Sequence, residues 1–400
     1  MLHYLKFTTF PLIALAVMHS MMQGGAWMYT GIAALVFVVA LGDILLPDDR
    51  SEPRMEGEFF LNLMLWLTLP ILMWVTLCFT WAVAPVDVLG IDGFMKDVFG
   101  YDRLQLQADT TWYQWFFGAL AGAFLFGAGG TNVGHELTHR TYSMRDMMLG
   151  RWMLAFTCDA SFSIEHVYGH HKNLGTPADP ATAQRGENVY GFVLKSTLGG
   201  YKSAWKLEKQ RLAKFNQSVW NPIYSRMMRG NLMSLSLFVA SLIIGGWAGV
   251  VMFWIMSAGG KTLLEIVNYM EHYGIVRRPE DKVEPRHSWN TNASVSTALL
   301  YALTRHSHHH AEADQEYWNL RSYRHAPMLP TGYLGTILLA LVPPLYKKVM
   351  TPLLNHWDET FATPEEKKLA IEASVKSGMK GLKSAQLGQN GVNTMNRAAA

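Results

Sequence analysis

Six apolar stretches, most of them as long as a membrane-crossing helix, constrain the fold of this chain more than any other feature. They cover residues 5–22, 26–46, 59–84, 112–132, 232–256 and 261–273. A hydrocarbon core about 30 Å thick needs roughly 20 apolar residues of helix, because every backbone polar group must be paired inside the segment. The sixth stretch contains Lys261, Glu265 and Glu271, so a buried amphipathic helix is the alternative there. The sequence therefore predicts an all-α, polytopic membrane protein with about six transmembrane helices.

The loops between these stretches differ in charge. Residues 86–110 are mainly acidic, whereas residues 133–230 are rich in lysine and arginine. Positively charged loops tend to stay in the cytoplasm. With tight turns expected at residues 22–25 and 257–260, this rule places both chain termini in the cytoplasm. It also places all the histidine-rich segments on that same side of the membrane.

The chain is then expected to divide into five consecutive parts that form one integrated domain with a mainly helical cytoplasmic cap. Residues 1–132 hold the first four transmembrane helices, and residues 133–230 form a cytoplasmic insertion with two histidine clusters. Residues 231–273 hold the last two transmembrane helices, and residues 274–360 form a cytoplasmic part with a third cluster. Residues 361–400 form a helical or polar tail.

Composition excludes several classes of function. The net charge of +3 is small and its charges are scattered, which argues against nucleic-acid binding. Only two cysteines occur, Cys78 and Cys158, and they form no CxxC pair. A disulfide framework and a cysteine-ligated zinc or iron–sulfur site are therefore not expected. The unusual residue is histidine, which occurs 15 times.

Most of the histidines are grouped. Three pairs have a spacing of four residues, which places two imidazoles on one face of a helix. Two further histidines adjoin these pairs, and another ends the sixth apolar stretch. The nine candidate metal ligands are His135, His139, His166, His170, His171, His272, His306, His309 and His310. His308 points away from its neighbours in a helix and is left out, and the isolated His3, His19, His287, His325 and His356 are interpreted as ordinary.

Nine buried imidazoles exceed the capacity of one ion, since a zinc ion takes four protein ligands or three and a water. Two metal ions fit the number, although imidazole suits zinc, copper, iron and nickel alike. His135-Glu136-Leu-Thr-His139 also matches the HExxH pattern of zinc proteases, so a membrane metalloprotease is the alternative from another class. A metal transporter would instead be expected to carry ionisable ligands near the membrane midplane.

The ordered motifs resemble those of the membrane-bound polyhistidine di-iron oxygenases, a family that includes alkane hydroxylases, xylene monooxygenases and fatty-acid desaturases. The match to the AlkB-type alkane 1-monooxygenases is close, and the resemblance covers roughly residues 25–360. Two departures are His308, where the family often has aspartate, and Arg286, where many members have histidine. Beyond the histidine clusters, the resemblance is carried by the segments NYMEHYG (268–274), HSWN (287–290), QSVW (217–220), TPADPAT (176–182) and LPTGY (329–333).

This resemblance implies terminal hydroxylation of medium-chain n-alkanes from the bilayer, with two iron ions held by the nine histidines and dioxygen as co-substrate. It also implies electrons from rubredoxin, supplied by a reductase and NADH, and a place in the bacterial cytoplasmic membrane. Xylene-type aromatic methyl hydroxylation and fatty-acyl desaturation are the alternatives. Four carboxylates near the clusters are expected to orient ligand histidines by accepting their second N–H. They are Glu136, Glu165, Asp179 and Glu271.

Overall fold

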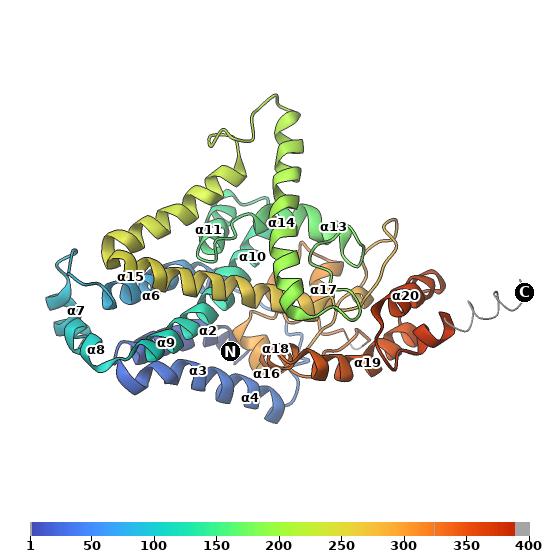
Figure 1. Ribbon diagram of the computed structural model, residues 1–400, viewed down its shortest axis with the longest axis horizontal. Helices are drawn as coiled ribbons and strands as arrows, with labels where there is room; N and C mark the ends of the chain where they lie inside the picture. Colours follow the sequence, from blue (N-terminus) through green and yellow to red (C-terminus); the bar gives the residue numbers. More distant parts are fainter. Residues whose placement is uncertain (1, 324, 389–400) are drawn as a thin grey trace, which may run out of the picture.

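The computed structural model describes residues 2–323 and 325–388, and helices joined by loops make up these ranges (Figure 1). In the described residues no β-strand forms, and an isolated bridge pairs Asn290 with Met328. The predicted all-α membrane fold is confirmed. Because the backbone groups of a helix are hydrogen-bonded within their own segment, a fold made of helices suits the bilayer.

Four helical segments are long and apolar enough to cross a membrane. The first, Gly25–Leu45, combines η2 (Gly25–Tyr29), α3 (Thr30–Ala34), η3 (Leu35–Ala40) and α4 (Leu41–Leu45). The second, Glu58–Ala82, consists of α5 (Glu58–Trp66) and α6 (Thr68–Ala82). The third, Trp112–His139, runs through α9 (Trp112–Leu125), η4 (Phe126–Thr131) and α10 (Asn132–His139). The fourth is α15 (Arg226–Glu271).

α15 is a single run of 46 helical residues, but it folds back on itself as a hairpin of two arms (Figure 1). The reversal occurs at Gly246, whose φ of 60° and ψ of −155° lie in a region that side chains other than glycine rarely adopt. The turn expected at residues 257–260 is therefore wrong. Those small residues lie inside the second arm, where Ser257 donates to the carbonyl of Phe156 at 2.5 Å. Small residues serve close helix packing as well as turns, and the pattern alone did not separate these roles.

The number of membrane crossings stays a prediction. The first apolar stretch forms α1 (Leu2–Leu5), η1 (Lys6–Thr8) and α2 (Thr9–Met21), which are not among the four candidate segments. In the second arm of α15, Lys261 contacts Asp159 and Glu265, with Nζ 2.5 Å from a carboxylate oxygen of each. This pairing removes the objection that an unpaired cation raises against an apolar environment.

Outside these four segments, two groups of helices can be followed along the long axis (Figure 1). α7 (Asp92–Phe99) and α8 (Arg103–Asp109) lie at one end, and the histidine-bearing cap and the C-terminal helices lie toward the other. The cap contains α11 (Met144–Ala155), α12 (Phe162–Glu165), η5 (His166–His170), α13 (His171–Asn173), α14 (Val189–Ala213), η6 (Pro285–His287), α16 (Ser294–Leu299), α17 (His306–Ala311), η7 (Tyr317–Asn319), α18 (Tyr333–Ala340), α19 (Pro343–Thr360) and α20 (Pro364–Ser377).

Two buried polar contacts tie the C-terminal helices to the histidine-bearing part. Arg185 donates from Nε to the carbonyl of Gly274 at 2.9 Å and pairs with Asp358 of α19. His287 Nε2 lies 2.7 Å from Glu366 of α20, and both side chains are buried. Burial alone would raise the pKa of Glu366, but hydrogen bonds from His287 and neighbouring groups lower it to about 2. His287 is thus paired with a carboxylate of α20 and belongs to none of the groups of converging imidazoles among the described residues.

Candidate metal centre

The nine predicted histidines meet at one junction in the cap. His135 and His139 come from α10, and His170 ends η5, followed by His171 at the start of α13. His272 directly follows the second arm of α15. The histidines of α17 approach from another side, and all nine side chains are buried or half-buried. Four segments that are distant in the sequence thus supply one cluster of imidazoles.

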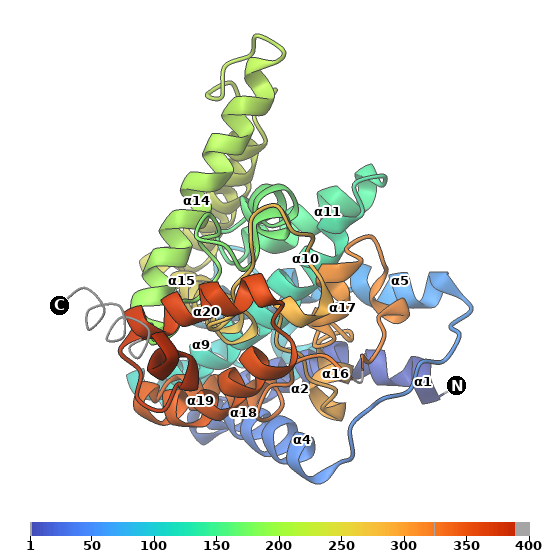
Figure 2. The same ribbon diagram turned by 90° about the vertical axis from the view of Figure 1, so that its right-hand side faces the viewer.

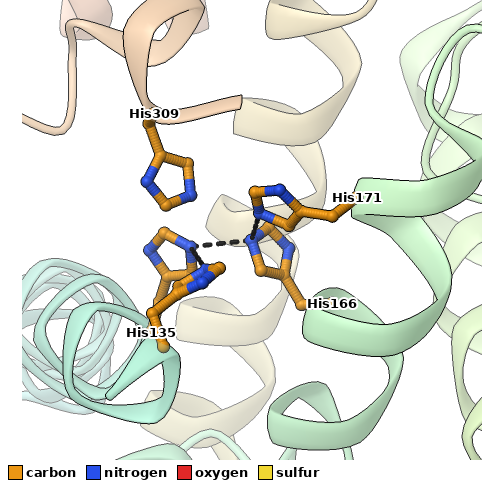
Figure 3. A group of neighbouring side chains, drawn as sticks. His135, His166, His171 and His309 are labelled. Atoms are coloured by element: carbon orange, nitrogen blue, oxygen red, sulfur yellow. Dashed lines mark hydrogen bonds between the residues drawn. The ribbon is translucent and has the colours of Figure 1, made fainter. Parts of the chain in front are cut away.

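One group contains five imidazoles whose nearest ring nitrogens all lie within 4.8 Å of one another (Figure 3). His135 Nε2 is 2.7 Å from His166 Nε2 and 2.9 Å from His139 Nε2, and His171 Nε2 is 3.0 Å from His166 Nε2. His309 of α17 closes the group. The rings converge from opposite sides with their Nε2 atoms directed toward a shared space (Figure 3).

A second group lies beside the first. The nitrogens of His170, His272 and His310 lie within 4.8 Å of one another, and those of His272 and His306 lie equally close to the carboxylate of Glu271. His272 Nε2 is 3.0 Å from His306 Nε2 and 3.3 Å from His310 Nε2. His166 and His310 connect the two groups, with ring centroids 6.2 Å apart. The arrangement therefore provides two adjacent ion-sized positions.

The second histidine cluster lies on a π-helix, which the sequence analysis did not predict. In η5 the backbone bonds from residue i to i+5 instead of i+4, so the turn holds one more residue than an α-helix. His171, five residues after His166, consequently returns to the same side as His166. Another π-turn, η4, lies directly before the α10 cluster. π-bulges are frequent at functional sites.

The geometry fits metal ions. For a metal–nitrogen bond of about 2.1 Å, neighbouring nitrogens of one coordination shell lie roughly 3 Å apart, which the observed spacings match. Such contacts cannot all be hydrogen bonds, because the Nε2 of His135 faces two other Nε2 atoms. His170 Nε2 and both nitrogens of His309 have no hydrogen-bond partner within the described residues. Buried polar nitrogens are costly unless paired, and coordinated ions would satisfy them.

The protonation of the rings suits coordination as well. Burial and the neighbouring imidazoles lower the pKa of His166, His306 and His309 well below its usual value. Burial lowers the pKa of His272 to about 3. These rings are therefore neutral at pH 7, and only a neutral imidazole can offer a lone pair to a metal.

Asp179 is the expected carboxylate that lies directly behind a histidine. His170 Nδ1 is 2.9 Å from Asp179 Oδ2, and the same carboxylate accepts from Thr182 Oγ1 at 2.6 Å and from the Ala181 amide at 3.0 Å. Burial would lower the pKa of His170, but the Asp179 charge raises it. With Nδ1–H donated to Asp179, the lone pair of Nε2 points toward His272 and His310.

Glu271 lies in a different position from the one expected. Its Oε2 is 3.2 Å from His306 Nε2, the nitrogen that faces the centre, rather than from a nitrogen at the back of a ring. Its Oε1 accepts a hydrogen bond from the hydroxyl of Tyr333. Glu271 therefore shares one ion-sized position with His272 and His306, and Tyr333 was not identified from the sequence.

The other two candidate carboxylates do not bond to histidines. Glu136 forms a salt bridge with Arg140 at 3.0 Å and accepts from the backbone amide of Tyr317 at 3.2 Å. Adjacent residues on a helix point about 100° apart, so Glu136 leaves the face that carries His135 and His139. Burial raises the pKa of Glu165 to about 8, and its Oε1 has no hydrogen-bond partner among the described residues. Closeness to the histidines in the sequence therefore did not predict the contacts of Glu136 and Glu165.

An apolar cavity ends at the histidines. It is lined by side chains of the transmembrane segments, α16 and α18, and its polar end contains His135, His166, His306 and Glu271. Sequence reasoning could not assign these lining residues, because nothing in one apolar membrane helix distinguishes a cavity-facing residue from a lipid-facing one. Among them are Val39, Phe124, Gly127, Ala128, Leu263, Leu264, Val267, Leu299, Leu303, Leu334 and Ile337.

Comparisons with known proteins agree with this site. The family model described as fatty acid desaturase matches residues 110–339. XylM, the xylene/toluene monooxygenase hydroxylase component of Pseudomonas putida, is 30% identical over 376 residues, which are 94% of this chain and 95% of that protein. Alkane 1-monooxygenase 2 of Pseudomonas aeruginosa is 32% identical and covers 82% of this chain and 84% of its own length. Alkane 1-monooxygenase of Pseudomonas putida is 37% identical over a region that covers 62% of this chain and 61% of that protein.

The fold and the site therefore define a helical membrane protein with buried histidine clusters. The chain belongs to the fatty acid desaturase family within the membrane di-iron superfamily. It is an oxidoreductase similar to alkane 1-monooxygenases and to XylM. The resemblance predicted from the histidine motifs is confirmed.

A first prediction concerns Asp179. We expect Asp179→Asn to lower turnover by roughly 10–100-fold, the usual effect of losing a partner behind a metal-bound histidine. The cause is loss of the charge that fixes the His170 tautomer. Metal content and the Mössbauer spectrum of protein loaded with iron should be measured together, because a merely structural role would leave the spectrum unchanged. Asp314→Asn, at an exposed position, is the matched control. An unchanged spectrum in the Asp179 variant would contradict the assignment.

Proposed function

We propose that this protein hydroxylates the terminal methyl group of medium-chain n-alkanes to primary alcohols. The proposed reaction consumes one dioxygen, two electrons from rubredoxin and two protons, and it releases the alcohol and one water. Two iron ions would be held by the nine histidines. This proposal is supported by the relatives named alkane 1-monooxygenase and by the convergence of the nine rings at one junction.

The apolar cavity that ends at the imidazoles is the observation that carries the proposal. Apart from the histidines, Glu271 and a few neutral polar groups, the side chains that line it are aliphatic or aromatic. An alkane from the bilayer gains little by moving into such a cavity, because lipid is as apolar as the lining. Fit and orientation would therefore select the substrate, and the chain end would be the part that meets the histidines.

The protein's own groups would act by positioning and by excluding water. The aliphatic lining would hold one end of the substrate near His135 and His306 and keep bulk water away from it. Asp179 would hold the Nδ1 proton of His170, and Glu271 would hold the hydroxyl proton of Tyr333 beside the reacting end. Bound iron would supply the activation of dioxygen and the removal of a hydrogen atom from the methyl group.

The zinc-protease alternative is disfavoured by the position of Glu136. In an HExxH protease this glutamate is the general base and must reach a water on the metal. Here Glu136 is bonded to Arg140 and to the Tyr317 amide, away from the rings. The five-histidine group also exceeds what a single zinc site uses.

Aromatic methyl hydroxylation is a second candidate, because the alignment with XylM covers nearly the whole of both chains. The cavity lining does not discriminate strongly, since aliphatic side chains suit a toluene ring and an alkane alike. Desaturation is supported less, because an acyl substrate would carry a polar head and, apart from the histidines and Glu271, no charged side chain lines the cavity in the described residues.

For orientation, we propose that the histidine side faces the bacterial cytoplasm, with both termini on that side. The support is the acidic character of residues 86–110 against the basic character of residues 133–230. Single cysteines at Asp97 and Lys206, in a background without Cys158, should react with an impermeant thiol reagent from opposite sides of intact cells. Reaction of both from outside would contradict this orientation.

The product assay tests the function itself. Membranes that contain the protein, supplied with NADH, a reductase and rubredoxin, should convert octane into 1-octanol whose oxygen derives from ¹⁸O₂. Toluene and an acyl substrate, offered in parallel, separate the alternatives. Octene or internal alcohols, or turnover restricted to toluene and xylenes, would show that another branch of the family chemistry is correct.

A further inference from the structure

α14 runs across the direction of the transmembrane segments instead of along it. In Figure 1 those segments lie roughly horizontal, whereas α14 stands nearly vertical where they meet the histidine-bearing cap, and it projects beyond the rest of the molecule. Figure 2, turned by 90°, shows the same projection. A helix perpendicular to the membrane-crossing helices lies parallel to the membrane surface.

The residues of α14 divide into three stripes. One stripe, with Phe192, Ser196 and Ala204, is buried against the protein. An apolar stripe is exposed, and it consists of Tyr190, Leu194, Leu198 and Tyr201, of which Leu194 is 68% exposed. A lysine stripe follows next around the helix and consists of Lys195, Lys202, Lys206 and Lys209, all exposed. At 100° per residue the apolar stripe spans roughly 80° and the lysine stripe roughly 60°.

The apolar stripe is continuous with lipid-facing surface at its Tyr201 end, near the middle of α14. Asn231, at the start of α15, donates from Nδ2 to the Tyr201 hydroxyl at 3.0 Å. From there the first arm of α15 continues with exposed Leu232, Leu235 and Val239 toward the turn at Gly246. The apolar stripe therefore faces the side on which this apolar arm leaves α14.

The other end of the stripe also meets an apolar surface. The Tyr190 hydroxyl donates to the carbonyl of Leu341 at 2.7 Å, and Leu338, Leu341 and Leu345 are exposed around the end of α18 and the start of α19. An exposed apolar band thus runs along residues 190–201 of α14, at the level where the transmembrane segments end. Contiguous apolar surface of this kind marks an interaction site in a folded protein.

Aromatic side chains gather at the projecting end. Trp205 of α14 and Trp220 of the following loop have ring centroids 4.9 Å apart, and Trp220 is 69% exposed. Phe215 and Ile223 of the same loop are also exposed. Tryptophan and tyrosine are enriched at the boundary between lipid tails and headgroups, because one part of the ring is apolar and the other polar.

The lysine stripe is largely free of protein partners. Lys195 pairs with Glu187 at 2.8 Å, whereas Lys202, Lys206 and Lys209 form no ion pair within residues 2–323 and 325–388. Glu208, the acidic residue of α14, is buried and bonded to Arg211. Lysines beside an apolar stripe can extend their ammonium groups to headgroup phosphates while their stems lie along the lipid.

We propose that α14 and the loop 214–225 lie in the interface of the bilayer on the histidine side, with the apolar stripe in the acyl boundary and the lysine stripe on anionic phospholipid headgroups. The occupant of this surface is lipid, because the apolar stripe continues into the lipid-facing surface of α15 and its charged border is uniformly basic. An amphipathic helix with these features binds in the interface plane.

This contact bears on the metal centre through the buried stripe of α14. A Cβ added at Gly169 would lie 3.3 Å from Leu207 Cδ1, and one added at Gly199 would lie 2.6 Å from Pro180 Cβ. These close approaches press α14 onto the two segments that carry His170 and Asp179. A bilayer that holds α14 thereby supports the segment that supplies three of the nine imidazoles.

The test measures membrane depth in the intact protein. A nitroxide is attached to a cysteine replacing Leu194 or, as the matched control, Lys206, in a Cys158→Ser background in which Cys78 is buried. The protein is placed in nanodiscs of phosphatidylcholine with phosphatidylglycerol. We expect the Leu194 probe to be more accessible to oxygen than to a water-soluble nickel chelate, and the Lys206 probe to show the opposite order. Equal and high chelate accessibility at both positions would overturn the proposal.

A second measurement tests the headgroup contact. The Leu194 probe should lie deeper in nanodiscs with phosphatidylglycerol than in phosphatidylcholine alone, and the combined change Lys202→Gln, Lys206→Gln and Lys209→Gln should remove this difference. Unchanged metal content would show that the variant is folded. A depth that ignores phosphatidylglycerol in the unaltered chain would overturn the headgroup assignment. The headgroup assignment would also be wrong if the triple variant kept the deeper position of its probe in phosphatidylglycerol but needed a higher concentration of an acidic electron-donor protein. The lysines would then bind a protein.

Discussion

His310→Ala is expected to lose metal and turnover together. The fall in turnover should exceed the roughly 10–100-fold that follows loss of the hydrogen-bond partner of a metal-bound histidine, because a ligand itself is removed. His310 Nε2 lies 2.9 Å from His306 Nε2 and 3.3 Å from His272 Nε2, so its removal opens one ion-sized position. Iron per chain, measured by mass spectrometry on protein purified from iron-supplemented cells, should fall from about two toward one. The product assay on the same preparation supplies the activity.

The control separates ligand loss from the loss of any histidine. His325 is exposed and far in sequence from the nine rings, so His325→Ala should keep both iron and turnover. A helical circular dichroism spectrum like that of the unaltered chain would show that His310→Ala is folded. Two irons retained in His310→Ala, with full turnover, would remove His310 from the proposed ligand set.

Phe124→Ala is expected to shift the preferred alkane toward longer chains. Phe124 lines the cavity and precedes His135 by 11 residues along one continuous helical segment, which places it roughly 16 Å from that ring along the helix axis. Removing its ring lengthens the cavity at the end distant from the histidines. Competition among alkanes of increasing length, with alcohols quantified by gas chromatography, should show the relative kcat/KM for the longer chains rising severalfold.

Phe116→Ala is the matched control, because Phe116 lies on the same helix but is exposed. It should leave the chain-length profile unchanged. A profile that is also unchanged in Phe124→Ala, with normal iron content, would show that the substrate does not reach this end of the cavity. The proposed entry of the alkane along the cavity would then be wrong, whereas the histidine assignment would stand.

The sequence allowed the fold class and the gathering of the nine histidines to be predicted, for physical reasons. Apolar stretches of bilayer length leave few alternatives to helices. Imidazoles that are closely spaced within each cluster must also lie together once their helices end on the same side of a membrane. His170, His272 and His310 come from segments far apart in sequence, yet each carried its own local pattern.

Features that depend on which side of a helix meets which neighbour could not be predicted. Glu136 and Asp179 are both carboxylates near histidines, but only Asp179 bonds to one. The hairpin turn was placed at residues 257–260, between the fifth and sixth apolar stretches, whereas the backbone angles of Gly246 put it inside the fifth. Tyr333 ends the LPTGY segment, but that pattern gave no role for its hydroxyl, since its contact with Glu271 joins residues 62 positions apart.

The π-turn at His166–His170 has a consequence for how this protein can change. The positions of three ligands depend on the number of residues in this turn as well as on their identity. One residue fewer would restore an α-helical turn and would rotate every later side chain by about 100° around the helix axis. Point substitutions between the histidines leave that number intact, whereas a deletion or insertion of a single residue alters it. Within 166–171, variation among functioning descendants of this sequence should therefore consist of replaced side chains, with the length of the segment held constant.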